Sequence, residues 1–335
     1  MKGGAFGIVL EDPRALHLAE RRVKRLELGF LGWISYVGRC RVSCEMAQKM
    51  LVAEHSTRTG LRRRYDWVSL SCLLYEVNWD ANPGWLSLSF DQPTLCLSVE
   101  EVGGRAEIRV RPDTPAEGEY FGADHLTLLA PADPVTLYSS SLRYAQFACI
   151  ILHPRESGCL NADQAELIVR APSRLMFRDE RLHTCAKMLS AYENENHGDA
   201  YGLGLRNALF AALVGVASKP APDSDDRLTG VPLARVLTHI AEHLDERVSN
   251  EGLAHLAEIP PIQFGRAFRA ATGLSPQRWQ MDARVRLAQR LMVDDPELPL
   301  SLIASRSGFA DQSHFSRAFI DILGTSPSAW LHQRR

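Results

Sequence analysis

The last hundred residues of this 335-residue chain contain the same short pattern twice, which strongly limits how they can fold. The first copy comprises residues 253–257, a turn at 258–261 and residues 264–268; the second comprises 302–306, a turn at 308–311 and 315–319. Each copy closes with a Gly-x-Ser-Pro segment and a Trp three residues after the Pro, at Trp279 and Trp330. Each copy predicts a short helix, a tight turn and a second helix with an Arg between buried aromatics. The repeat therefore predicts two helix-turn-helix units.

The period of apolar residues predicts that the whole tail is helical. The seven expected helices cover residues 233–244, 250–257, 261–272, 276–292, 300–306, 312–323 and 327–332. Gly273 stands where a left-handed cap ends a helix, and Asp311 where a side chain caps the next one. The helix at 276–292 would span about 25 Å. It could therefore set the two units about one DNA turn, roughly 34 Å, apart.

The front part has a different texture, with short β-type runs between turn residues. The expected strands are Trp67–Tyr75, Gly84–Phe90, Thr94–Val99, Ala106–Arg111, His125–Leu129, Val135–Ser140 and Leu142–Leu152. Such regularly spaced short strands predict a sandwich or barrel. Helices are expected at 13–28, 43–54, 181–192 and 201–216. The Pro-rich acidic run at 218–226 predicts a linker.

These patterns predict a multidomain α+β protein. Residues 1–220 would form the strand-rich domain with its helices, 221–232 the linker, and 233–335 the all-α tandem helix-turn-helix domain. Residues 227–335 carry 13 Arg, no Lys and 11 acidic residues, whereas the front part carries 25 basic and 29 acidic residues. Charge alone is too even to indicate nucleic acid, but Arg suits phosphate and guanine edges.

Cysteine usage and hydropathy indicate a cytoplasmic protein. The seven Cys all lie in the front part, and no Cys-x-x-Cys pair occurs, so reduced thiols are expected. The longest apolar run, near 208–217, is shorter than a membrane helix requires, and residues 1–11 lack the pattern of a signal peptide.

The tail resembles the AraC/XylS family of bacterial transcription regulators over about residues 231–335. The resemblance is carried by the segment 308–319, by Gly324-Thr325-Ser326-Pro327, and by Leu253-Ala254, Phe264, Arg266, Phe268 and 272–276 in the first unit. Arg284, Arg286, Leu287, Ala288 and Leu291 carry it in the connecting helix. The front part looks like the family's cupin-like effector-binding and dimerisation domain, on its strand run and on the segments 126–131 and 150–154.

Three positions depart from the family pattern. Pro260 replaces a Ser or Thr N-cap, which removes a cap worth about 1 kcal/mol from the first recognition helix. Gly265 stands where a base-reading side chain is common, and Leu302 replaces a usually acidic residue. Sequence discrimination is therefore expected to depend more on the second unit.

The residues expected to read DNA lie on the recognition helices, opposite the buried Phe pairs. By position and by the resemblance, the base-reading residues are Ile262, Gln263, Arg266, Gln312, Ser313, Ser316 and Arg317, with Gln263 flanking on the phosphate side. The residues expected to contact the DNA backbone are Arg269, Arg278 and Arg306. Arg284 and Arg286 are expected to be solvated or to face phosphate. A structural salt bridge or a phosphate clamp is the alternative for Arg266 and Arg317.

Other chemistry-bearing residues have plainer interpretations. Arg62–Arg64 could form an anion patch, but a solvated loop is predicted. Cys40 and Cys44 are predicted to be buried structural thiols. His125 and His153 lack the close spacing of a cupin metal site, so no metal and no cofactor is expected. About half of the strand aromatics should be simple core, because side chains alternate between the faces of a strand.

The expected function is therefore a sequence-specific DNA-binding transcription regulator. The resemblance implies an activator that works with RNA polymerase, binds double-stranded promoter DNA as a homodimer, responds to a small-molecule effector, and acts at the bacterial nucleoid. In the alternative, the front domain only dimerises, and the regulator is constitutive or controlled by a partner protein. An enzyme is not expected, because no nucleophile elbow, zinc motif or phosphate loop is present.

Overall fold

The computed structural model describes residues 51–334, except for 54–56, 81–82, 112, 115, 117, 193–199, 219–227 and 229. The predicted helix at 13–28, the first eight residues of the predicted helix at 43–54, and Cys40 and Cys44 lie outside the described residues. Residues 49–335 cluster as one compact unit, and the division at 220 stays a prediction.

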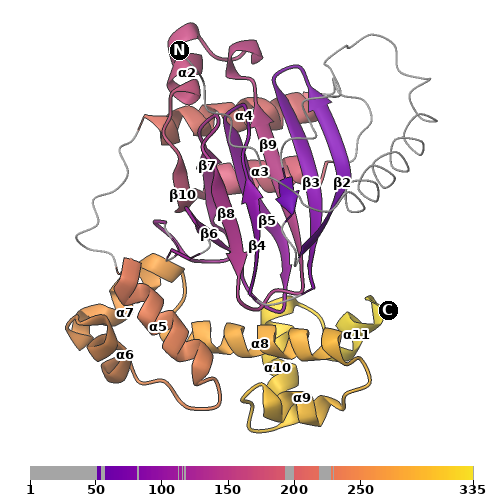
Figure 1. Ribbon diagram of the computed structural model, residues 1–335, viewed down its shortest axis with the longest axis vertical. Helices are drawn as coiled ribbons and strands as arrows, with labels where there is room; N and C mark the ends of the chain where they lie inside the picture. Colours follow the sequence, from indigo (N-terminus) through magenta and orange to yellow (C-terminus); the bar gives the residue numbers. More distant parts are fainter. Residues whose placement is uncertain are drawn as a thin grey trace, which may run out of the picture. The chain divides into compact units, whose positions relative to one another are not determined.

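Two antiparallel sheets form the front part of the chain (Figure 1). The smaller sheet has the order β1-β4-β8-β6, with bounds Leu51–Ala53, Gly84–Leu88, Val135–Ser139 and Glu107–Arg109. The larger has the order β10-β7-β5-β9-β3-β2, with bounds Arg174–Phe177, Leu126–Leu129, Thr94–Val102, Tyr144–Leu152, Leu70–Trp79 and Thr57–Trp67.

Side chains of the larger sheet alternate between its two faces, and each face contributes to one of two hydrophobic cores. Leu73, Tyr75 and Val77 on β3 face the smaller sheet, where Leu86 and Leu137 complete the same cluster. Residues on the opposite face, such as Leu74 and Leu97, pack against helices instead. These are α2 (Ala162–Val169), α3 (Glu180–Ser190) and α4 (Ala200–Ala217), and Figure 1 shows α3 and α4 lying across the strands. The front part is thus a two-sheet structure covered by helices on one side, which confirms the predicted class.

Several local predictions for the front part were wrong. Residues 62–64 lie on strand β2, not in a solvated loop, and Arg62 and Arg64 form ion pairs with Glu76 and Asp66. Leu51–Ala53 form a strand where a helix was expected. Strand β10 and helix α2 were not predicted. The sequence did not predict β2, because this edge strand is rich in charged residues and only its ends are buried. Its sequence therefore lacks an apolar period.

Helix α4 is long and apolar enough to satisfy a length-and-composition test for a membrane span, as the one such helix among the described residues. Its Leu209, Phe210 and Leu213 are completely buried in the core shared with α3 and the larger sheet. This packing accounts for one face of the helix, since 33% of the helix is buried.

Seven helices follow, as predicted. Their bounds are α5 Gly230–Glu242, α6 Asn250–Ala257, α7 Pro261–Thr272, α8 Pro276–Asp294, α9 Leu300–Arg306, α10 Gln312–Leu323 and α11 Pro327–His332. The first begins three residues earlier than expected, so the predicted linker at 221–232 overlaps it. The left-handed conformation at Gly273, with φ +77°, ends the first recognition helix as expected, and Gly324, with φ +74°, ends the second in the same way.

Asp311 caps the second recognition helix, and its carboxylate accepts a 2.7 Å hydrogen bond from the His314 amide. We expect Asp311→Ala to lower the free energy of unfolding by about 1 kcal/mol, because this amide would lose its partner. Chemical denaturation monitored by circular dichroism would measure the change. Asp311→Asn keeps a side-chain acceptor and is the matched control. An equal loss in both variants would show that the charge of Asp311, rather than the cap, stabilises the helix.

Candidate DNA-binding surface

The first helix-turn-helix unit is built around two aromatic side chains. Phe264 and Phe268 lie four residues apart on α7, are completely buried, and have ring centroids 5.6 Å apart. Phe268 also meets Trp279 at the start of α8 in an edge-on contact of 6.1 Å. Since one face of α7 is fixed inward by these rings, the opposite face must lie on the surface.

The second unit repeats this packing. Phe315 and Phe319 on α10 are completely buried, with centroids 5.5 Å apart, and Phe319 meets Trp330 at 5.9 Å. The repeat in the sequence is therefore a repeat of core contacts, down to the Trp that closes each unit.

The predicted base-reading residues lie outside both cores. On α7, Ile262 is 90% exposed, and Gln263 and Arg266 are exposed. On α10, Gln312, Ser313 and Arg317 are exposed and Ser316 is half-buried. Within the part of the chain that the structure describes, no packing contact explains an Ile at this exposure. The local fold thus leaves these side chains on surfaces that could meet base edges, although their contacts with DNA stay a prediction.

The predicted backbone-contacting arginines divide into two groups. Arg269 and Arg306 are exposed and form no ion pair within the part of the chain that the structure describes. Arg278 is only half-exposed and forms an ion pair with Asp321 of α10. This pair ties the connecting helix α8 to the second unit, so Arg278 already has a structural role.

Two further arginines on α8 contradict the prediction that they are solvated. Arg284 donates to the backbone carbonyls of Leu244 and Glu246, at 2.5 and 3.1 Å, and so fastens α8 to the segment after α5. Arg286 is 16% exposed and lies in a cluster of buried charges. Helical position could not reveal either contact, because the partners lie about 40 and 180 residues away.

The two residues near α7 that differ from the family pattern, Pro260 and Gly265, have clear structural consequences. Pro260 provides no side-chain cap, as expected. At Gly265, an added Cβ would meet nothing closer than the Asn250 amide nitrogen at 4.0 Å. The site therefore has room for a side chain, and its glycine leaves a gap in the exposed face of α7.

Gly265→Ala is expected to raise the free energy of unfolding by about 0.5–1 kcal/mol, because alanine loses less backbone entropy in a helix. Gly204→Ala, in another helix at a site with open space, is the matched control and should gain a similar amount. Thermal melting would measure both. A loss of stability at 265 alone would mean that α7 needs its glycine.

The front part holds a small cavity between its sheets. It has a volume of about 20 Å³ and is lined by Tyr75, His125, Phe147 and the thiols of Cys96 and Cys149, among others. A volume of this size suits about one water molecule. His125 donates from Nδ1 to the Gly122 carbonyl at 3.0 Å. Two of the aromatics in the front part, Trp79 and Phe90, belong to the hydrophobic core.

A second cavity, of about 420 Å³, lies between sheet residues and helices α5 and α8. Its lining mixes apolar side chains, such as Phe121 and Leu237, with the guanidinium groups of Arg105, Arg286 and Arg290. Sequence reasoning missed this site, since its walls come from separate segments of the chain between Glu101 and Arg290. The only local signal was a pair of opposite charges, Asp282 and Arg286, one turn apart on α8.

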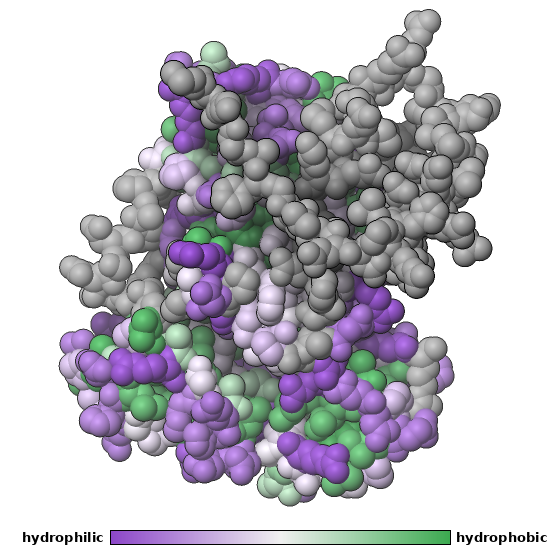
Figure 2. Space-filling view, viewed as in Figure 1, coloured by the Kyte–Doolittle hydropathy of each residue, from purple (hydrophilic) through white to green (hydrophobic). Residues whose placement is uncertain are grey.

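Over the C-terminal helices, the face shown in Figure 2 mixes polar residues with smaller apolar patches. Such a surface fits a domain that presents Arg, Gln and Ser side chains to a polar partner.

Known proteins share the C-terminal part of this chain. The family model described as a helix-turn-helix domain matches residues 253–333. The probable transcriptional regulator LumQ of Photobacterium leiognathi is 33% identical over 92 residues, which cover 28% of this chain and 37% of that protein. The arabinose operon regulatory protein of Escherichia coli K12 is 32% identical over 93 residues, covering 27% of this chain and 31% of its own length. The solved DNA-binding domain of AdpA, in complex with a target DNA, is 34% identical and covers 32% of this chain and 95% of its own, with a TM-score of 0.29.

Two units with the same core and the same left-handed Gly C-cap define the C-terminal part as a tandem helix-turn-helix domain. Over these residues the chain is similar to transcription regulators of the AraC/XylS family. Both relatives are named as regulators. The chain matches about a third of the length of each of these two relatives.

Proposed function

We propose that this protein is a sequence-specific DNA-binding transcription regulator, and an activator, that reads two successive major grooves with α7 and α10. The observation that carries the proposal is the duplicated surface: each unit buries a Phe pair and exposes an Arg two residues after the first Phe, Arg266 in one and Arg317 in the other. An Arg on the exposed face of a recognition helix can bind guanine through two hydrogen bonds.

The connecting helix supports the reading of two grooves. Helix α8 has 19 residues, which corresponds to a length of about 28 Å. Its Trp279 contacts Phe268 of the first unit, and its Arg278 pairs with Asp321 of the second. A single chain could then place two recognition helices about one turn of DNA apart, roughly 34 Å.

In this proposal the front part controls the C-terminal domain. The family resemblance supports a homodimer that contacts RNA polymerase in the cytoplasm, at the nucleoid, and a cupin-like front domain. Of the two cavities described above, only the larger, of about 420 Å³, falls in the size range of ordinary ligand pockets, about 300–1,000 Å³. A small-molecule effector would therefore bind there, and a saturable rise in melting temperature with a candidate compound would support it over partner-protein control.

Capture of fragments from the source genome with purified full-length protein, followed by sequencing, tests the function directly. We expect an asymmetric motif of two blocks about one turn apart. A single block would overturn the reading of two grooves, and no enrichment over a mock capture would overturn sequence-specific binding by the protein alone.

A further inference from the structure

Gly265 leaves a gap in the middle of the exposed face of α7. Ile262 lies three residues before it and Arg269 four residues after it, so both belong to the same side of the helix, and Arg266 follows directly. These three side chains are exposed. The proposed reading surface of the first unit therefore has a gap at its centre, where α7 offers no side chain to the DNA.

A side chain from the neighbouring helix borders this gap. Asn250 is the first residue of α6, and its amide nitrogen lies 4.0 Å from the position that a Cβ of residue 265 would occupy. This separation is ordinary van der Waals contact. Because Asn250 is also exposed, its amide stands at the surface beside the gap.

Gln277 fixes the orientation of the Asn250 amide. Nε2 of Gln277 donates to Oδ1 of Asn250 at 3.0 Å. An asparagine amide carries two N–H donors besides this oxygen. In the part of the chain that the structure describes, the two N–H groups of Asn250 have no hydrogen-bond partner, so both are available to an acceptor outside the protein.

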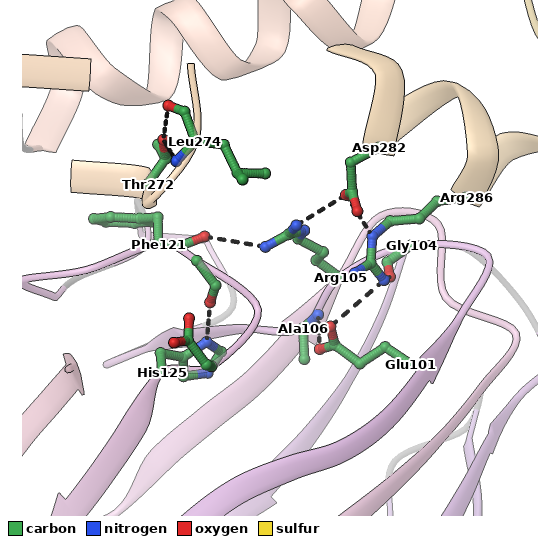
Figure 3. A network of polar contacts seen from close by, with 12 residues as sticks. Glu101, Gly104, Arg105, Ala106, Phe121, His125, Thr272, Leu274, Asp282 and Arg286 are labelled. Atoms are coloured by element: carbon green, nitrogen blue, oxygen red, sulfur yellow. Dashed lines mark hydrogen bonds and ion pairs between the residues drawn. The ribbon is translucent and has the colours of Figure 1, made fainter. Parts of the chain in front are cut away.

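The end of α7 in turn positions Gln277. Thr272 is 1% exposed, and its hydroxyl donates to the Phe268 carbonyl at 2.8 Å and accepts from the Leu274 amide at 3.3 Å, a contact that Figure 3 shows. Gln277 follows three residues later, in the first turn of α8. The Asn250 amide is therefore oriented by the packing of α6, α7 and α8, which reduces the entropy lost when it binds.

The second unit has the reverse arrangement. Directly after its first buried Phe, α10 carries Ser316 in place of Gly265. The counterpart of Asn250, three residues before the start of the repeated pattern, is Pro299, which has no side-chain donor. Each unit thus has one polar side chain at this place, on the preceding helix in the first unit and on the recognition helix in the second.

We propose that Asn250 reads DNA for the first unit by donating from its amide to an acceptor on a base edge opposite Gly265, and that Gln277 is the residue that positions it. The inference rests on the proposed function and adds α6 to the reading surface. In the major groove, N7 of the purines, O6 of guanine and O4 of thymine accept such hydrogen bonds. The first unit then discriminates between sequences more than its glycine predicts.

Asn250→Ala in the full-length protein tests this role by fluorescence anisotropy on the captured cognate site and on random DNA. We expect binding to the cognate site to weaken about 2- to 12-fold, the range that corresponds to one hydrogen bond. Binding to random DNA should change less than about twofold, because it depends on phosphate contacts. The variant should fold, since Ser249 still accepts from the Gly252 amide at 3.1 Å and caps α6.

The matched control is Asn207→Ala, at an exposed position of α4 where the amide oxygen likewise accepts from a neighbouring side chain, Arg206. It should bind both DNAs like the unchanged protein. Gln277→Ala should give a smaller loss than Asn250→Ala, again on the cognate site alone, because the amide remains but is no longer oriented.

Gly265→Gln separates reading from a structural effect, because it gives α7 its own amide in the gap. In this background, Asn250→Ala should cost less than about twofold on the cognate site, since two residues that serve one contact are not additive. A loss caused by damage to the fold would be the same in both backgrounds, and that result would overturn the proposal.

Equal losses on cognate and random DNA would also overturn base reading, because Asn250 would then touch phosphate only. Unchanged binding of Asn250→Ala to a site that the unchanged protein prefers would overturn the contact and leave the proposed function intact. If the unchanged protein prefers no sequence at all, the proposed function itself fails, and the role of Asn250 with it.

Discussion

Phe315→Ala is expected to lower the free energy of unfolding of the C-terminal helices by about 3–5 kcal/mol, enough to lose the second helix-turn-helix unit. The reason is its complete burial between Phe309 and Phe319, at centroid distances of 5.4 and 5.5 Å. Truncation would leave a cavity between these two rings. Urea denaturation followed by tryptophan fluorescence and circular dichroism would measure the loss.

Ile320→Ala is the matched control for this substitution. Ile320 lies on the same helix but is 48% exposed, so its truncation should change stability by no more than about 0.5 kcal/mol. Similar effects in the two variants would show that burial does not set the energetics of α10. The aromatic core would then not be the reason for the repeated pattern.

Arg317→Ala is expected to weaken binding to the cognate site by about 5- to 150-fold, while binding to random DNA falls much less. The fold-change corresponds to the roughly 1–3 kcal/mol of discrimination that a paired Arg–guanine contact provides. Arg317 is exposed on α10, so its loss should not disturb the core. Anisotropy titrations on both DNAs at one fixed salt concentration give the ratio.

Arg306→Ala supplies the contrast, since Arg306 is exposed on α9 and is expected to contact phosphate. It should weaken binding to both DNAs equally and reduce the slope of log affinity against log salt by about one. The same behaviour in Arg317→Ala would mean that Arg317 touches phosphate only and does not read the sequence.

Local sequence predicted a helix correctly wherever the residues that determine the helix lie within it or next to it. The buried pairs Phe264–Phe268 and Phe315–Phe319, the cap at Asp311 and the left-handed Gly273 all follow from residues within a few positions of one another. These contacts recur at short spacing in any helix of this kind, so the period and the caps determined the elements.

Local sequence was a poor guide at the edge of the larger sheet. Strand β2 reads as a charged loop through Arg62–Arg64, because its side chains gain stability from pairing with β3 rather than from an apolar face. Cross-strand partners such as Glu76 are set by register, which depends on the whole hairpin. Propensity within the segment therefore could not identify it.

The sequence by itself determined the tandem helix-turn-helix domain, its two aromatic cores and the exposure of residues such as Ile262 and Arg317. These depend on contacts made within one helix or between adjacent helices. Only the tertiary structure decided that Arg286 and Asp282 are buried against Glu101 and Arg105. The physical reason is distance along the chain, because the partners lie about 180 residues apart. In the sequence each of these charged residues looks like an ordinary surface residue, and only folding removes the partners from water.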